Sequence, residues 1–224
     1  MPHRVLIPLG GGGYGPEQTL TLQPDAATGQ DDSVNSGVST ANYGIRTNLV
    51  AATTYRGLLK YDLSSIPATA KCISATLSLY QMATGAAQAF TITVSSIASG
   101  NAAWIEGTRN GTQALAGQPC WDALAADGAG GVTTAWAGSA GLSTAGTDYE
   151  TPALGTFNGN RSDPDGTEYS VALPTDRVRG WFGATNTNYG LLITTNVAPG
   201  GLGSSDHATA GYRPKLVIVY RLKN

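Results

Sequence analysis

The stretches Ala75–Tyr80 (ATLSLY) and Phe90–Ser95 (FTITVS) decide the fold class, because apolar residues alternate in both with small hydroxyl-bearing ones. Successive side chains of a β-strand point to opposite faces of its sheet. Leu77 and Leu79 therefore share one face of the first stretch, and the polar residues between them share the other. We predict two half-buried strands, each with one face on a core and the other toward solvent.

Other stretches repeat this signal or strengthen it. Alternation recurs in two of them, whereas three are continuously apolar, as is typical of central or doubly covered strands. The alternating stretches are Gln18–Gln23 and Glu168–Leu173, and the continuous ones are Gly57–Leu63, Gly190–Thr195 and Lys215–Arg221. One short helix is predicted at Thr175–Phe182, where Val178 and Trp181 have the spacing of an inward face and Thr175 or Asp176 could cap the start.

Composition supports a β protein and excludes some partners. Of 224 residues, 12% are charged, 30 are glycine and the net charge is −2. The charged fraction is about half the usual value, and no basic stripe or polybasic cluster favours nucleic acid or anionic lipid. We therefore expect no nucleic-acid partner and no membrane insertion. Cys72 and Cys120 match no zinc or redox spacing, which leaves two buried thiols or a single disulfide as alternatives.

Long segments rich in Gly, Pro, Asn, Asp and Ser separate the predicted strands. They cover Pro24–Gly44, Gly100–Gly117, Asp127–Gly146, Gly155–Gly166 and Pro199–Gly211. Loops of this length suit the ends of a β-sandwich. We predict an all-β fold, an antiparallel, jelly-roll-like β-sandwich with long Gly-rich loops and one short helix. Residues 1–17 are expected to form a flexible arm, and residues 18–224 a single domain.

The order of several motifs resembles a known family. The motifs are Asn42-Tyr43-Gly44, the string RGLLKYDLSSIP at 56–67, Trp104-Ile105-Glu106, Asn188–Leu192, and Tyr212–Tyr220. In this order they resemble the DNRLRE-type domain, a family of extracellular β-sandwich modules of which some bind carbohydrate. The resemblance spans roughly residues 18–221 and implies a module without catalytic activity of its own.

The residues themselves also argue against an enzyme. Ser205, Asp206 and His207 are the residue types of a hydrolytic triad, but they are consecutive. Triad members normally come from separate segments that converge in space, so a polar turn before the last strand is the preferred interpretation. Glycosidases need two paired carboxylates, and nothing in the sequence pairs any two of its acidic residues.

Two kinds of binding site remain open. For carbohydrate, an exposed aromatic ring offers a flat face on which a sugar can stack, and we predict Trp136, Tyr149, Tyr189 and His207 as contacts. No cofactor is expected other than a structural calcium ion. The residues predicted for that calcium site are Asp31, Asp32, Asp163 and Asp165.

Two functions compete at this point. The first is a structural module of a bacteriophage virion, in a head decoration, fibre or tail, that docks through the arm residues Val5, Leu6, Ile7 and Leu9 and also contacts host glycans. Its partners would be other virion or surface subunits, including copies of itself. The second is a carbohydrate-binding module of a secreted or cell-surface protein. Both place the protein in a virion or outside a cell. Residues 1–17 lack the apolar core of a signal peptide, which leaves non-classical export, a signal already removed, or release by cell lysis.

Overall fold

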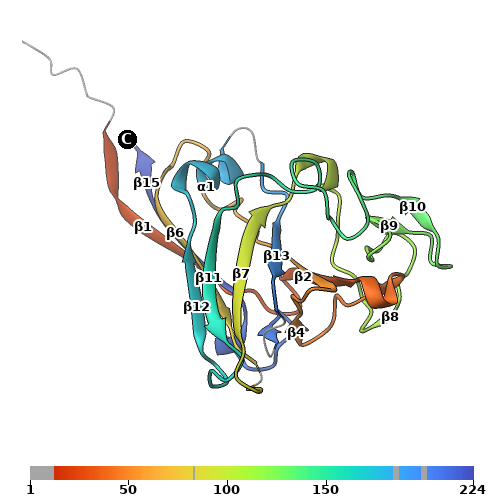
Figure 1. Ribbon diagram of the computed structural model, residues 1–224. Helices are drawn as coiled ribbons and strands as arrows, with labels where there is room; N and C mark the ends of the chain where they lie inside the picture. The colour runs from red at the N-terminus through yellow and green to blue at the C-terminus, as the bar shows by residue number, and fades with distance from the viewer. Residues whose placement is uncertain (1–12, 83, 184–186, 198–200) are drawn as a thin grey trace, which may run out of the picture.

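Two antiparallel sheets packed face to face form the body of the protein (Figure 1). The computed structural model describes residues 13–82, 84–183, 187–197 and 201–224. One sheet has four strands in the order β1-β15-β6-β12, and the other has five in the order β11-β7-β13-β5-β2. All pairings within both sheets are antiparallel. The predicted all-β sandwich is therefore confirmed.

The strands of the two sheets are β1 Tyr14–Leu22, β2 Gln30–Asn35, β5 Tyr55–Lys60, β6 Lys71–Tyr80, β7 Ala89–Ser96, β11 Gly155–Asn160, β12 Glu168–Ala172, β13 Leu191–Thr195 and β15 Lys215–Lys223. The shorter elements are β3 Ala41–Asn42, β4 Asn48–Leu49, β8 Thr112–Gln113, β9 Ala125–Ala126, β10 Val132–Thr134, β14 Leu202–Gly203, the 3-10 turns Ser36–Val38, Ser99–Asn101 and Ala210–Tyr212, and the helix α1 Thr175–Phe182.

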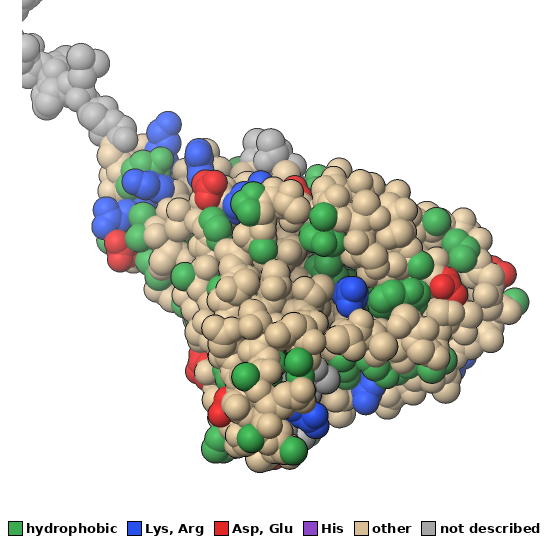
Figure 2. Space-filling model, in the orientation of Figure 1, with side chains coloured by type: hydrophobic (Ala, Val, Ile, Leu, Met, Phe, Trp, Pro, Cys, Tyr) green, Lys and Arg blue, Asp and Glu red, His purple; other side chains and the backbone are tan. Residues whose placement is uncertain are grey.

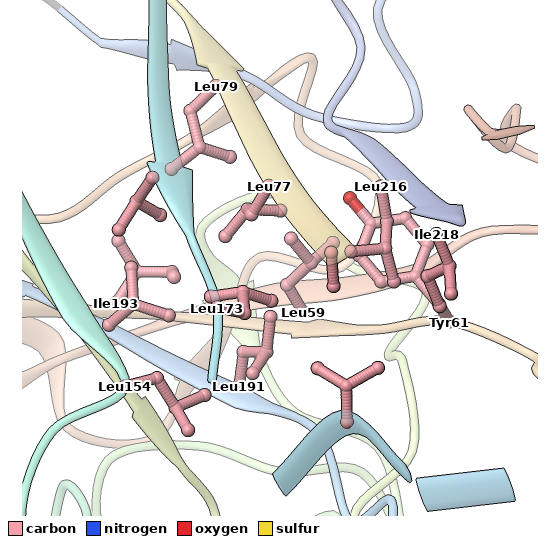
Figure 3. Packing of buried hydrophobic residues seen from close by; sticks show 14 of the residues in the cluster. Leu59, Tyr61, Leu77, Leu79, Leu154, Leu173, Leu191, Ile193, Leu216 and Ile218 are labelled. Carbon is pink, nitrogen blue, oxygen red and sulfur yellow. The ribbon is translucent and has the colours of Figure 1, made fainter. Parts of the chain in front are cut away.

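The main core lies between the sheets. Leu77 of β6 stands opposite Leu216 of β15 and is fully buried, and Leu191 and Ile193 meet it from the other sheet. Figure 3 shows these side chains pointing toward one another from both layers. The period of two in the sequence thus decides which residues of each strand enter the core.

A second core covers the outer face of the five-stranded sheet. In β5, Leu59 belongs to the main core, whereas its neighbour Leu58 packs in a separate cluster with Trp104 and Trp136. The chain between β7 and β11 supplies most of that cover and forms the lobe that carries β8, β9 and β10 (Figure 1). The prediction of doubly covered strands is confirmed for β5 and β13. For β15 the other form of the prediction is confirmed, because this strand is central in its sheet, although Val217 on its outer face is only partly buried.

Two strands of the main sheets lie inside predicted loops. β2 falls within Pro24–Gly44 and β11 within Gly155–Gly166. The sequence of β2, QDDSVN, carries no apolar alternation, yet five of its six residues are buried. Its backbone pairs with β5 along its whole length, and its polar side chains find partners in distant segments. Burial without an apolar pattern explains why the sequence did not indicate this strand.

The helix has its predicted bounds, whereas the last residues of the predicted arm belong to a strand. α1 has the predicted bounds, and Val178 and Trp181 face inward, but the N-cap residue is Pro174 and makes no side-chain capping bond. β1 begins at Tyr14, so the end of the predicted arm, residues 14–17, belongs to the sheet. The arm residues Val5, Leu6, Ile7 and Leu9 lie outside the described residues.

Both cysteines are free buried thiols, so the disulfide alternative is wrong. Cys72 lies in the main core and Cys120 in a small cluster of alanines within the lobe. Among the described residues, no helix is both long and apolar enough to cross a bilayer.

The position of Leu77 generates a stability prediction. Leu77→Ala removes a fully buried side chain from the centre of the main core and is expected to lower the free energy of unfolding by about 2–5 kcal/mol. Urea denaturation measures the loss. Val132→Ala in β10, where the side chain is 49% exposed, is the control and is expected to change stability by less than about 0.5 kcal/mol. Equal losses in the two variants would contradict the placement of the core.

Candidate functional site

Three carboxyl groups from distant segments meet at one edge of the sandwich. Asp31 comes from β2, Glu106 from the segment that follows the Ser99–Asn101 turn, and Asp206 from the loop after β14. One carboxylate oxygen from each lies within 4.8 Å of the others. Asp31 is buried, and Glu106 and Asp206 are half-buried. We call this group the carboxylate cluster.

Strand register and hydrogen bonds position the cluster. Asp31 stands opposite Leu59 in the sheet, so its side chain lies on the face that looks toward the main core. The Asp31 backbone N–H donates to Glu106 Oε1 at 3.2 Å, and the Ser205 N–H donates to Asp31 Oδ2 at 2.6 Å. Gln30 Nε2 donates to the Trp104 carbonyl at 2.9 Å, which holds the Glu106 segment beside β2. Three distant parts of the chain are thus joined at one point.

Two hydroxyls close to the cluster have no hydrogen-bond partner among the described residues. Ser205 Oγ is enclosed by protein, and it belongs to the residue whose backbone N–H donates to Asp31. Tyr61 Oη is likewise enclosed. Burial raises the pKa of Tyr61 well above its usual value, and the charge of Asp31 raises it further.

Burial also raises the pKa of each carboxyl group in the cluster. It raises the pKa of Asp31 to about 6, although the hydrogen bond from the Ser205 backbone N–H opposes it. It raises the pKa of Glu106 to about 8, and the charges of Asp31 and Asp206 add to the effect. The pKa of Asp206 is raised by burial and lowered in part by the charge of Arg213. Without a counter-charge, the cluster therefore retains a proton on Glu106 near neutral pH.

The neighbouring residue Asp32 lies outside the carboxylate cluster and makes structural hydrogen bonds. It stands opposite Leu58, on the other face of the sheet, and is fully buried. Its Oδ1 accepts from the Ser33 and Tyr43 N–H groups at 2.7 and 3.0 Å, and its Oδ2 accepts from Asn42 Nδ2. Asn42 in turn donates to the Pro119 carbonyl at 3.1 Å. Asp32 therefore fixes loop backbone and does not join the cluster.

Asp148 organises a second loop in the same way. Its carboxylate accepts from the N–H groups of Gly138, Ser139 and Thr144 at 2.8–3.0 Å and from Asn101 Nδ2 at 3.1 Å. Burial raises the pKa of Asp148, but these bonds outweigh it, and the net pKa lies below the usual value. Asp148 is thus an ionised support for the loop over the second core.

The structure separates the predicted calcium residues. Asp31 lies in the carboxylate cluster, whereas Asp163 and Asp165 lie in the turn between β11 and β12. Asp163 Oδ2 accepts from the Tyr169 hydroxyl at 2.8 Å, and Asp165 Oδ1 accepts from Thr84 Oγ1 at 3.2 Å. The four predicted residues do not form one site.

The residues predicted to contact carbohydrate make different contacts within the protein. Trp136 was expected to be exposed and is instead 4% exposed, with its Nε1 donating to the Cys120 carbonyl at 2.9 Å. This expectation was wrong because the Gly-rich loop folds back onto the sheet. Tyr149 and Tyr189 pack against the second core and are partly buried. His207 is half-buried, and its Nδ1 accepts from the Thr209 N–H at 3.1 Å.

The consecutive Ser205, Asp206 and His207 do not form a triad in this structure. Ser205 Oγ has no hydrogen bond to His207, and the His207 ring meets Thr209 and Tyr212 instead. Glu106 and Asp206 were not predicted to lie together or with Asp31. No sequence signal could have paired them, because their contact depends on how the lobe and the C-terminal loop pack on β2.

A hollow of about 580 Å³ lies between α1 and the connection that follows β5. Its lining includes Lys60, Tyr61, Trp181 and Asn188. Trp181 is buried, so its ring offers no open face for a sugar to stack on.

Comparisons with known proteins add little to this description. No family model and no curated protein matches the chain. Among solved structures, the chain is similar to the infectious bursal disease virus VP2 subviral particle, at 14% identity and a TM-score of 0.18, over 99% of this chain and 42% of that one. A TM-score this low carries no argument about fold or function. The resemblance to DNRLRE-type domains therefore stays a prediction from sequence motifs.

The Asp32–Asn42 contact predicts a large effect of one substitution. Asn42 is fully buried and uses both ends of its amide, since Oδ1 accepts from the Gly44 and Arg109 N–H groups at 3.1 Å. Asn42→Ala leaves these buried partners without a hydrogen bond and is expected to lower the free energy of unfolding by about 2–4 kcal/mol. Urea denaturation measures the loss. Asn110→Ala, at an exposed position nearby, is expected to have little effect. A small loss for Asn42→Ala would contradict this role.

The raised pKa values predict how the free energy of unfolding depends on pH in a buffer that EDTA keeps free of divalent metal ions. A carboxyl whose pKa is higher in the folded state stabilises the fold fully below its unfolded pKa of about 4. That contribution is lost as the pH rises through about 6 for Asp31 and about 8 for Glu106. The free energy of unfolding should therefore fall between about pH 4 and 8, and the share of Asp31, on the order of 3 kcal/mol, should be lost between about pH 4 and 6.

Urea denaturation at several pH values measures this fall. Glu106→Gln removes one titrating group and should flatten the curve between pH 7 and 8. Carboxylates with lowered pKa values, such as Asp148, affect stability only at more acid pH. A stability that rises steadily from pH 5 to 8 would contradict the raised pKa values.

Proposed function

We propose that this protein is a non-catalytic structural module of an extracellular assembly, in the first place a virus particle. In this proposal it docks on neighbouring subunits along the open edge of β1, next to its N-terminal residues. The single observation that carries the proposal is that no described strand pairs with the outer side of β1.

β1 is the sheet edge that the described residues leave uncovered. β11 and β12, each at the edge of its own sheet, lie beside one another, and β2 at the other edge lies against β3 and β4. β1 pairs with β15 on one side, and no strand among the described residues pairs with its other side. Its outer backbone N–H and C=O groups are thus available to a strand from another chain.

The sequence of β1 protects only its beginning. Pro16 and a register shift between Tyr14 and Glu17 disrupt pairing there. The remainder, Gln18–Leu22, pairs regularly with β15, and its residues are exposed or half-buried. An open and regular segment of this kind is a typical site of strand addition.

The surroundings of β1 are basic. Tyr14 stands opposite Lys223, and Arg221 stands opposite Lys71 in the same sheet. Figure 2 shows Lys and Arg side chains gathered at this end of the molecule, while the rest of the visible face carries few charges. Glu17 pairs with Arg221 at 2.7 Å and neutralises part of this charge. We therefore expect the docking surface of the partner to be acidic or neutral.

The carbohydrate-binding alternative has less support. Trp136 is enclosed, and the Arg56 guanidinium lies over the ring of Trp121, 5.5 Å from its centre. Neither ring presents a clear face for stacking a sugar. Contact with host glycans therefore remains a prediction from the sequence.

Two proline variants test docking along β1. In an antiparallel strand, the N–H groups of adjacent residues point alternately toward the partner strand and away from it. Of Gln18→Pro and Thr19→Pro, one therefore removes an outward N–H and should abolish assembly while the fold persists. The other removes a bond to β15 and should lower the melting temperature. Light scattering measures the assembly state, and thermal unfolding measures the fold.

A truncation that lacks residues 1–12 separates the arm from the edge. If the arm and the edge both contribute to docking, removal of the arm is expected to weaken assembly at least about tenfold and to leave the melting temperature unchanged. Val132→Ala, far from β1 in the lobe, is the control for assembly. Normal assembly of both proline variants would overturn the proposal.

A further inference from the structure

We propose that the carboxylate cluster, together with Ser205 Oγ, is a calcium site that ties β2, the lobe and the C-terminal loop together. The proposal is independent of docking along β1, because none of its residues lies on that strand. It differs from the calcium site expected from the sequence, since only Asp31 is common to both.

The donor set selects the class of ion. The cluster offers carboxylate oxygens from Asp31, Glu106 and Asp206, with no histidine or cysteine in the group. Hard cations such as Ca²⁺ and Mg²⁺ prefer oxygen ligands, whereas zinc and copper sites in proteins are rich in nitrogen and sulfur. The site therefore suits a hard divalent cation.

The spacing of the oxygens admits calcium, and the origin of the ligands favours it within this class. Ca²⁺ binds oxygens at about 2.3–2.6 Å, so two of its ligands can stand up to about 5 Å apart. The carboxylate oxygens of the cluster lie within 4.8 Å of one another and fit such a sphere. Mg²⁺ binds oxygens at about 2.1 Å and demands near-ideal octahedral geometry. Calcium also tolerates the irregular geometry of ligands from two loops and a strand.

The Ser205 hydroxyl is the second, independent observation. It is enclosed and has no hydrogen-bond partner among the described residues, which is costly for a buried polar group. The backbone N–H of the same residue donates to Asp31 Oδ2 at 2.6 Å, so Ser205 lies at the cluster. A Cβ on Gly29 would stand 2.3 Å from Ser205 Oγ, so glycine is required for the hydroxyl to occupy this place. A cation bound by the cluster would give that oxygen a partner.

The local charge balance points the same way. None of the ion pairs between described residues involves Asp31, Glu106 or Asp206. Arg213 is the cation that acts on Asp206, and its Nε is engaged with the His207 carbonyl at 2.8 Å. Three carboxylates this close repel one another when ionised. A divalent cation would remove most of that repulsion and join three chain segments.

Calorimetric titration of the purified, EDTA-treated full chain with CaCl₂ tests the site. We expect one ion per chain, with a dissociation constant of about 10⁻⁴–10⁻³ M, as in extracellular modules. Several millimolar Ca²⁺ should then raise the melting temperature by about 3–8 °C, and Mg²⁺ at the same concentration should raise it less. An equal or larger shift with Mg²⁺ would overturn the assignment to calcium. Absence of saturable binding would overturn the site itself.

Matched variants locate the ion. Asp206→Asn and Glu106→Gln each remove a charge at a half-buried position and should weaken Ca²⁺ binding at least tenfold. Ser205→Ala should weaken it by a smaller factor. Asp165→Asn makes the same chemical change in the β11–β12 turn and should bind Ca²⁺ as the wild type does. Wild-type affinity in Asp206→Asn, or loss of binding in Asp165→Asn, would overturn the proposal.

Near-UV circular dichroism in EDTA shows whether each variant keeps its tertiary packing. If one of the variants fails to fold, the wild-type titration still decides whether a calcium ion binds, and the other variant locates it. Truncation of residues 1–12 should leave Ca²⁺ binding unchanged, which separates this result from the test of docking.

Discussion

Burial of the five-stranded sheet on both faces is the constraint on which the rest of the structure depends. Leu58 and Leu59 are adjacent in β5, face opposite ways, and are both fully buried. A single partner sheet can cover only one of these faces. The chain between β7 and β11 must therefore fold back over the other, and Trp104 and Trp136 fill the space beneath it. The apolar area buried there stabilises an otherwise loop-rich segment.

Covering the second face brings irregular backbone into the interior, where each polar group needs a partner. Asp32 and Asn42 meet this need on one side of the lobe, and Asp148 and Asn101 on the other. These residues are buried, and their partners are mostly backbone N–H groups of loops. The same packing places Glu106 beside β2. The carboxylate cluster is thus a consequence of how the lobe returns to the sheet, and a bound cation would strengthen that return.

The edges of the two sheets differ in how far they are covered. Among the described residues, β11 and β12 lie beside one another and short strands lie against β2, whereas β1 keeps one edge open. A protein that protects most of its edges and leaves one regular segment unprotected is suited to strand pairing with another chain. The proposed docking edge and the proposed calcium site therefore have separate roles, one in assembly and the other in holding the lobe to the sandwich.

The sequence by itself determined the fold class, seven of the strands and the bounds of the helix, because a period of two or of three to four reports locally which face is buried. It did not indicate β2 or β11, whose residues are polar or glycine-rich, and it placed Trp136 in solvent. Only the tertiary structure decided that Asp31, Glu106, Asp206 and Ser205 meet, because their proximity depends on packing between distant segments. Local patterns report burial, but they carry no information about which distant side chains become neighbours.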